Sequence, residues 1–145
     1  MQNNPKVHLY GNSAAICLEA TQNGSIATLN IDVAPKPDNH NVDWLKKITL
    51  QLGFDEMVGV AGVFLGYAPE FSCKRPSKGI SFKRQPGKVF VSASAGTGQI
   101  YGVPLTIGDC VQFGDFVLAR ISLNCYSQSS DLLLASIKGA LALNR

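Results

Sequence analysis

Apolar and polar residues alternate along the first third of the chain in the way that β-strands require. The alternation covers about residues 7–10, 14–20, 25–33 and 44–52, and Asn23-Gly24 predicts a hairpin turn between the second and third segments. In the third segment, Ile26, Thr28, Asn30 and Asp32 share one face, and Ala27, Leu29, Ile31 and Val33 share the other. In the fourth segment, the pattern predicts an inward face made of Trp44, Lys46, Ile48, Leu50 and Leu52. The face toward water is made of Lys47, Thr49 and Gln51.

The period then changes to that of a helix over about residues 54–65. Asp55 and Glu56 lie in its first turn, where a carboxylate is favourable, and Gly66 ends it. After Glu56 the segment carries no charge, so it is apolar on every side and is expected to be buried all round. We expect one side of this helix to face a partner subunit.

The second half repeats the plan of the first. Strands are expected at about 71–76, 79–86, 88–95 and 99–106, followed by a helix over about 109–124 with Thr106 or Asp109 as its N-cap. A last helix begins near Ser129 and runs to about Leu143. The pattern predicts an α+β fold with the order strands, helix, strands, helix and a short C-terminal helix, in a single domain spanning 1–145.

Composition narrows the class of protein. A hydrophobic content of 46% with 16% charged residues excludes a disordered chain. The N-terminal stretch MQNNPKVHLY has no apolar run, so no signal peptide is expected, and no segment approaches the ~20 apolar residues of a membrane span. The widely spaced Cys17, Cys73, Cys110 and Cys125 are typical of reduced thiols in a cytoplasmic protein, although the spacing leaves a single disulfide open.

Charge is distributed very unevenly. From Phe71 to Gly108 the chain runs 38 residues without Asp or Glu, and Lys74–Lys88 contains six of the 13 Lys and Arg residues. A sheet with charges of one sign repels itself unless an anion lies on it, and a phosphate backbone is the commonest such anion. The alternative is a solvated basic edge that discourages strand-on-strand aggregation.

Aromatic residues are interleaved with these cations, which is the combination that binders of single-stranded nucleic acid need. Cations follow the backbone, and flat side chains stack on bases for about 1–3 kcal/mol per base. The predicted phosphate contacts are Lys74, Arg75, Lys78, Lys83, Arg84 and Lys88, with Lys47 of the first sheet as a second-tier contact. The predicted stacking residues are Phe82, Phe90 and Tyr101, although Phe82 and Phe90 have core packing as an alternative. No recognition helix carries the charges, so no readout of base edges is expected.

Catalytic and metal-binding patterns are absent from the sequence. His8 and His40 are the only histidines, and neither is paired with a cysteine or carboxylate motif. Gly96-Thr97-Gly98 lacks the Lys-Ser/Thr of a phosphate loop and is expected to be a hairpin turn. We therefore expect no enzyme, no metal and no cofactor. A structural or scaffolding oligomer, or a binder of small apolar ligands, is the alternative to nucleic-acid binding.

Several local strings, in order, resemble the Whirly family of single-stranded DNA-binding proteins, within the wider PC4-like group. Ser13–Glu19 occupies the position of the family's KGKAAL strand. The other matching strings are Leu29–Pro35, Asp43-Trp44 with the following Lys46 and Lys47, Asp55-Glu56, Ser72-Cys73, Lys78-Gly79 and Pro104-Leu105-Thr106. The resemblance covers about residues 10–124. It implies two antiparallel sheets, a homotetramer with its helices at the centre, and single-stranded DNA, or RNA, bound between neighbouring sheets with little sequence preference.

Two departures from the family pattern affect this expectation. Gly11 and Ser13 replace the two lysines of KGKAAL, a strand that in the family contributes to DNA binding and to higher assembly. The stretch between Glu19 and Ser25 is also shorter, which would remove a hairpin from the first half.

Overall fold

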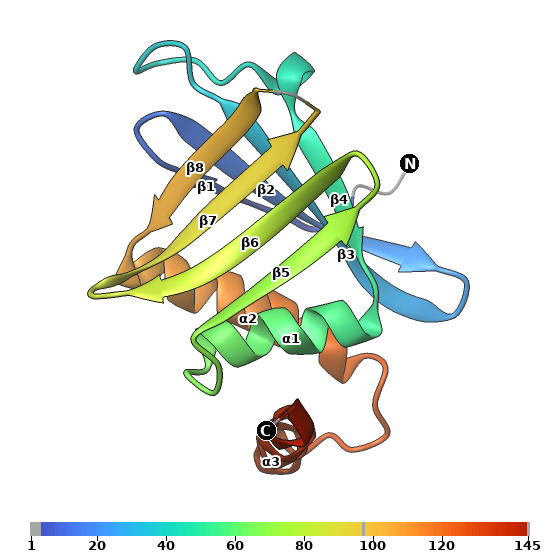
Figure 1. Cartoon of the computed structure of the whole chain (residues 1–145). Coiled ribbons are helices and arrows are strands. Elements are labelled where there is room, and N and C mark those ends of the chain that lie inside the picture. The colour runs from blue at the N-terminus through green and yellow to red at the C-terminus, as the bar shows by residue number, and fades with distance from the viewer. Residues whose placement is uncertain (1–3, 97, 145) are drawn as a thin grey trace.

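Two antiparallel sheets and a layer of helices make up the computed structural model, which describes residues 4–96 and 98–144 (Figure 1). Sheet 1 contains, in spatial order, β1 (Lys6–Tyr10), β2 (Ala14–Asn23), β3 (Ile26–Pro35) and β4 (Ile48–Leu52). Sheet 2 contains, in spatial order, β5 (Glu70–Arg75), β6 (Lys78–Gln85), β7 (Lys88–Ala95) and β8 (Gln99–Leu105). The helices are α1 (Phe54–Phe64), α2 (Ile107–Ser122) and α3 (Ser130–Leu141), with short 3-10 turns η1 (Trp44–Lys46) and η2 (Ala142–Asn144). The predicted α+β class, with two antiparallel sheets, is confirmed.

The core lies between the two sheets and the helices, and the strand alternation decides which side chains enter it. On β3, the predicted inward residues Leu29, Ile31 and Val33 are completely buried. On sheet 2, the row Phe71, Phe82, Val91 and Val103 runs across all four strands on the inner face. Each sheet therefore has one face in the core and one outer face, and Figure 1 shows α1 and α2 crossing one end of the sheets.

The predicted strand 44–52 is shorter than expected. Only Ile48–Leu52 pairs with β3, and Trp44–Lys46 forms a 3-10 turn instead, because the Asp43 side chain accepts a hydrogen bond from the backbone N–H of Leu45 at 3.2 Å. The turn rotates Lys46 out to solvent and brings Trp44 against His8 on the outer side of β1, so the predicted inward positions of Lys46 and Trp44 are both wrong.

The shorter stretch after Glu19 does not remove a hairpin. β2 and β3 pair over their whole length, and the turn between them has Gly24 at a φ of 62°, which a residue without Cβ adopts freely. Sheet 1 therefore keeps four strands.

Thr106 and Asp109, the two alternatives for the N-cap of the second helix, act together. The Thr106 hydroxyl accepts a hydrogen bond from the Asp109 N–H, and the Asp109 carboxylate accepts one from the Thr106 N–H, both at 3.1 Å. This reciprocal capping box satisfies two backbone donors and starts α2 at Ile107, two residues before the predicted position.

The charge-free helix α1 is covered by its own chain. Val60 has an exposed fraction of 0%, and Gly62 is in such close contact with Leu141 of α3 that a Cβ there would overlap the leucine side chain. In Figure 1, α1 lies beside α2 and above α3. The burial of Val60 needs no partner subunit, but Val58 and Phe64 of the same helix are only half-buried, so the expectation that one side of α1 faces a second copy stays a prediction. The most exposed large apolar side chains on or directly after α2 and α3 are Ile107, Val111, Leu123, Leu132 and Leu143.

All four cysteines are free thiols. Burial raises the pKa of the Cys73 thiol to about 12, which keeps that thiol protonated and unreactive. Among the described residues, no helix has the length and apolar character that crossing a membrane requires. Residues 1–3 of the N-terminal stretch and Thr97 of the predicted 96–98 turn lie outside the described residues.

Candidate nucleic-acid interface

The outer face of sheet 2 carries three exposed lysines and one aromatic ring. Lys74 on β5, Lys83 on β6 and Lys88 on β7 all belong to the residues that alternate away from the core. Phe90 lies on the same face, opposite Lys83 in the register, and its ring lies over Gly102 of β8. A Cβ at Gly102 would come within 2.6 Å of the Phe90 ring, so the absence of a side chain at Gly102 lets the ring lie on the sheet. The ring is partly exposed and is available to stack on a base.

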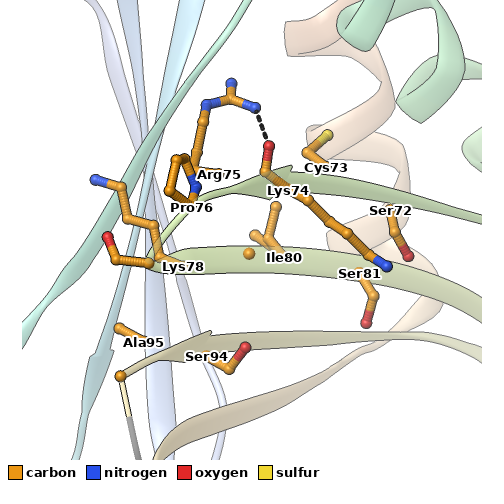
Figure 2. A pocket seen from close by; sticks show the side chains of 13 residues that line it. Ser72, Cys73, Lys74, Arg75, Pro76, Lys78, Ile80, Ser81, Ser94 and Ala95 are labelled. Atoms are coloured by element: carbon orange, nitrogen blue, oxygen red, sulfur yellow. Dashed lines mark hydrogen bonds between the residues drawn. The ribbon is translucent and has the colours of Figure 1, made fainter.

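Hydroxyl groups fill the space between these lysines. Ser72, Ser81 and Ser92 are neighbours on β5, β6 and β7 in a single row across the outer face, and Ser94 follows on β7. Lys74, Ser72, Ser81 and Ser94 border a shallow surface groove that also includes the β5–β6 turn. Figure 2 shows the Lys74 side chain lying along the sheet toward Ser72 and Ser81. Lys78 and Arg75 also line this groove, so it offers the ammonium groups of Lys74 and Lys78 and several small donors to a phosphate or sugar.

One acidic residue joins this face. Glu70, just before the acid-free stretch, is exposed on β5 and opposite Lys83 in the register. The ion pairs among the described residues are Lys47–Asp32 and Arg75–Glu56, so Lys83 is not held by Glu70. The outer face keeps an excess of positive charge from its three lysines.

Phe82, a predicted stacking residue, belongs to the core, and the prediction is wrong. Its exposed fraction is 0%, and its ring packs edge-on against Phe64 of α1 at 6.1 Å and Phe113 of α2 at 5.6 Å. Phe64 and Phe113 are stacked on each other at 4.4 Å. Phe82 alternates to the inner face with Ile80, and this triad of rings fixes sheet 2 to both helices.

Arg84 also points away from the outer face. It is two residues after Phe82 and so alternates to the same inner face of β6. Its guanidinium donates a hydrogen bond to the backbone carbonyl of Val63 near the end of α1. A cation at the C-terminus of a helix satisfies free carbonyls and the helix dipole. Arg84 therefore has a structural partner, which argues against its predicted phosphate contact.

Arg75 is engaged in a similar way. Its guanidinium donates to both carboxylate oxygens of Glu56 at 2.8 Å and to the backbone carbonyl of Gln51 at 2.7 Å. In Figure 2 the Arg75 side chain extends away from the serines of the groove, with a further hydrogen bond to the Lys74 carbonyl. Arg75 links sheet 2 to sheet 1 and to the start of α1, so its predicted role on phosphate is not supported.

The Glu56–Arg75 pair makes stability depend on pH. The hydrogen bonds from Arg75 hold the pKa of the Glu56 carboxyl below its ordinary value, although partial burial acts in the opposite direction. A carboxyl whose pKa is lower in the folded state stabilises the fold above its unfolded pKa, and this contribution is lost as the pH falls through the folded pKa.

We expect Glu56→Gln to be less stable than the wild type at pH 7 and the difference in stability between the two proteins to shrink as the pH falls below the ordinary pKa of a glutamate, because the wild-type carboxyl then becomes protonated. Denaturant unfolding at a series of pH values measures this. Asp55→Asn is the matched control, since it removes a carboxylate from the same turn without touching Arg75. A stability difference between wild type and Glu56→Gln that is constant from pH 7 to 3 would contradict the prediction.

Tyr101 and Lys78 belong to the residues that alternate toward the inner face of sheet 2, near its junction with sheet 1. The Tyr101 hydroxyl donates to the backbone carbonyl of Lys46 at 3.0 Å, and Gln99 donates to the same carbonyl and to the Tyr101 hydroxyl. Tyr101 is thus tied to η1 and not presented for stacking, contrary to prediction. Lys78 is in the same row as Gln99, with Ala95 of β7 between them, and it is half-buried beside the β5–β6 turn, where it lines the groove together with Lys74.

Lys47 lies apart from the other candidates, next to the outer face of sheet 1. Its side chain is 48% exposed, as predicted, and its ammonium is 3.6 Å from a carboxylate oxygen of Asp32. The structure therefore brings together Lys74, Lys83, Lys88 and Phe90 on one outer face, and Lys78 and Arg75 line the same groove as Lys74. The remaining predicted site residues, Phe82, Arg84, Tyr101 and Lys47, lie elsewhere.

Sequence reasoning missed an aromatic cluster on the outer face of sheet 1. His8 and Tyr10 of β1 are stacked, and the edge of the Trp44 ring packs against His8. The alternation within Lys6–Tyr10 already places His8 and Tyr10 on one face, which was the available signal. The contact with Trp44 depends on the 3-10 turn, which no periodicity indicates.

This chain resembles known proteins in its fold and not in its sequence. No family model matches the sequence, and no curated protein matches it. Among solved structures, WHY3 from Arabidopsis thaliana is 16% identical, with 98% of this chain and 99% of that chain covered at a TM-score of 0.65. The chain has the Whirly fold.

Two further structures share the Whirly fold. The plant transcriptional regulator PBF-2 is 14% identical, with a TM-score of 0.61 over 83% of this chain and 82% of that one. A guide-RNA-binding protein complex bound to a guide RNA is 10% identical, with a TM-score of 0.65 over 85% of this chain and 93% of that one. At these identities the likeness concerns the Whirly fold and not individual site residues.

Proposed function

We propose that this protein binds single-stranded DNA or RNA without sequence preference and without catalysis, as one nucleic-acid-binding domain in a homo-oligomer. The observation that carries the proposal is the outer face of sheet 2, where Lys74, Lys83 and Lys88 surround a serine row and the Phe90 ring. Cations follow a phosphate backbone, and a ring on a flat sheet stacks on a base of any identity.

The comparisons support the same class of ligand. One protein with this fold is described as a guide-RNA-binding complex bound to its RNA, and another as a transcriptional regulator. The outer face of sheet 2 is an open surface with a shallow groove, which suits an unpaired strand that can turn its bases toward the protein.

Fluorescence anisotropy of a labelled oligo-dT, titrated at two salt concentrations with duplex DNA as competitor, tests the proposal. We expect binding that weakens steeply with salt and that duplex does not compete away. An oligo-U of the same length then compares RNA with DNA. No binding at low salt would refute the proposal and favour the alternative of a scaffolding oligomer or an apolar-ligand binder, whose affinity would not follow salt in this way.

The homo-oligomer, a tetramer by resemblance to the family, is proposed to form through the helical layer. Because α1 is covered by α3, the surface for a second copy is the exposed side of α2, where Val111 is 68% exposed and Ile107 lies one turn away. Exposed apolar side chains on one helix face are typical of an assembly surface.

We expect Val111→Asp to dissociate the oligomer while the fold persists, since the residue is exposed within the single chain. Light scattering during size-exclusion chromatography gives the mass, and circular dichroism gives the fold. Leu45→Asp, at a fully exposed position outside the helical layer, is the matched control and should leave the mass unchanged. A Val111→Asp protein with the mass of the wild-type oligomer would contradict the proposed interface.

A further inference from the structure

The aromatic cluster on sheet 1 has the geometry of a stacking surface. The rings of His8 and Tyr10 are 6.2 Å apart and nearly parallel, at 11°, and the Trp44 ring meets His8 at 5.7 Å and 74°. Tyr10 is the outermost ring, with 60% of its surface exposed. The stack leaves this ring without an aromatic neighbour on its far side among the described residues.

Trp44 reaches this cluster by crossing the sheet. It precedes β4, whereas His8 is on β1, and β2 and β3 lie between those strands. The row next to His8 contains Ala15 and Ala34, which are completely buried although they belong to the outer face. These two small side chains leave room for the indole to lie on the sheet. The position of the cluster is therefore built into the fold.

The charges around the cluster are mixed. Lys6, Lys46 and Lys47 are all exposed. Lys47 pairs with Asp32, however, and Glu19 lies opposite Lys6 in the register. The Asp32 carboxylate also accepts a hydrogen bond from the Thr49 hydroxyl at 2.6 Å, which fixes it in place. This surface thus has cations that can reach a phosphate backbone, but its excess of positive charge is smaller than that of the outer face of sheet 2.

We propose that the outer face of sheet 1 is a second binding surface for unpaired nucleobases, with Tyr10 as the stacking platform and His8 and Trp44 as the residues that position it. The inference rests on the proposed function, because it assigns a second surface for the same class of ligand. The ligand is single-stranded nucleic acid, since a planar ring stack beside lysines satisfies both the base and the phosphate of a nucleotide.

The two surfaces differ in the force that drives binding. Sheet 2 offers three lysines around one ring, so its affinity follows counterion release, whereas sheet 1 offers ring stacking among partly compensated charges. Binding at sheet 1 therefore depends less on salt. The two outer faces also point away from one another, so one chain contacts nucleic acid on both of its sides.

The only tryptophan of the chain lies in the cluster, which makes the surface directly observable. Oligo-dT is titrated into the protein while Trp44 fluorescence and the anisotropy of the labelled oligonucleotide are both recorded. We expect quenching of Trp44 in the wild type. Tyr10→Ala should reduce the affinity measured by this quenching at least fivefold, and Tyr10→Phe, which keeps the ring, should restore it. Tyr126→Ala, which removes a fully exposed tyrosine from the α2–α3 linker, is the matched control.

The outcomes separate this inference from the proposed function. Quenching that survives Lys83→Glu and is lost in Tyr10→Ala supports a second surface. The second surface is overturned if anisotropy reports binding through Lys83 and Phe90 while Trp44 fluorescence does not respond and Tyr10→Ala has no effect. The proposed function stays intact in that case. No anisotropy change in any variant overturns both. Thermal unfolding of Tyr10→Ala and Tyr10→Phe shows whether either variant is misfolded, and a folded Tyr10→Phe without restored quenching also overturns the assignment.

Discussion

Reversal of both Lys74 and Lys83 to glutamate is expected to lower the affinity for oligo-dT more than tenfold at about 0.1 M salt. Both side chains are exposed on the outer face of sheet 2, on adjacent strands, and each is placed to neutralise a phosphate. For single strands, the slope of log affinity against log salt changes by about 0.7 for each neutralised phosphate, so the double variant should have a slope shallower by about 1.4. Anisotropy titrations at four salt concentrations measure both quantities.

A global change in net charge has to be separated from the loss of these contacts. Lys83→Glu and Lys138→Glu change the net charge equally, but Lys138 lies on α3, where its ammonium is 5.9 Å from the centre of the Tyr67 ring. Lys83→Glu should weaken binding several-fold more than Lys138→Glu. Equal effects of the two variants would show that sheet 2 is not the site and that only the overall charge matters.

Truncation of Phe82 to alanine is expected to destabilise the fold by about 3–5 kcal/mol. The side chain is completely buried between Phe64 and Phe113, and its removal leaves a cavity at the point where sheet 2 meets both helices. That loss is a large part of the ~5–15 kcal/mol that a domain of this size has in total. Denaturant unfolding followed by circular dichroism measures it.

Phe90→Ala is the matched control, because it removes the same side chain from the outer face of the neighbouring strand. It should cost much less stability than Phe82→Ala and should lower the affinity for oligo-dT, by about 1–3 kcal/mol for one lost stacked base. A Phe90→Ala protein with unchanged affinity would contradict the stacking role. Equal losses of stability in both variants would contradict the assignment of Phe82 to the core and Phe90 to the surface.

Most of the fold could be predicted because period and capping are local properties of the sequence. Alternation located the strands, a change of period located α1, and the Thr106 and Asp109 side chains marked the start of α2. The Trp44–Lys46 turn could not be predicted from alternation, because one hydrogen bond from the Leu45 N–H to the Asp43 side chain interrupts a pattern that otherwise fits a strand.

The candidate site was predicted less completely, since a cluster of cations in sequence is divided by the two faces of a strand. Lys83 and Arg84 are adjacent in sequence, yet one is on the outer face and the other reaches the Val63 carbonyl on the helix side. The sequence predicted that Arg75 contacts phosphate, but in the fold its guanidinium forms an ion pair with Glu56. Alternation fixes which residues share a face, but only the tertiary partners show which cations are already engaged.

The close contact between Gly62 and Leu141 has a consequence for the order of folding during synthesis. The ribosome completes α1 and both sheets before it releases α3, so the apolar side of α1 that α3 covers stays open to water until α3 has emerged. A chain interrupted before residue 130 would keep that side exposed, as a surface prone to aggregation. Of the three helices, α3 is therefore the last to join the helical layer, and the absence of a side chain at Gly62 leaves the space in which Leu141 docks.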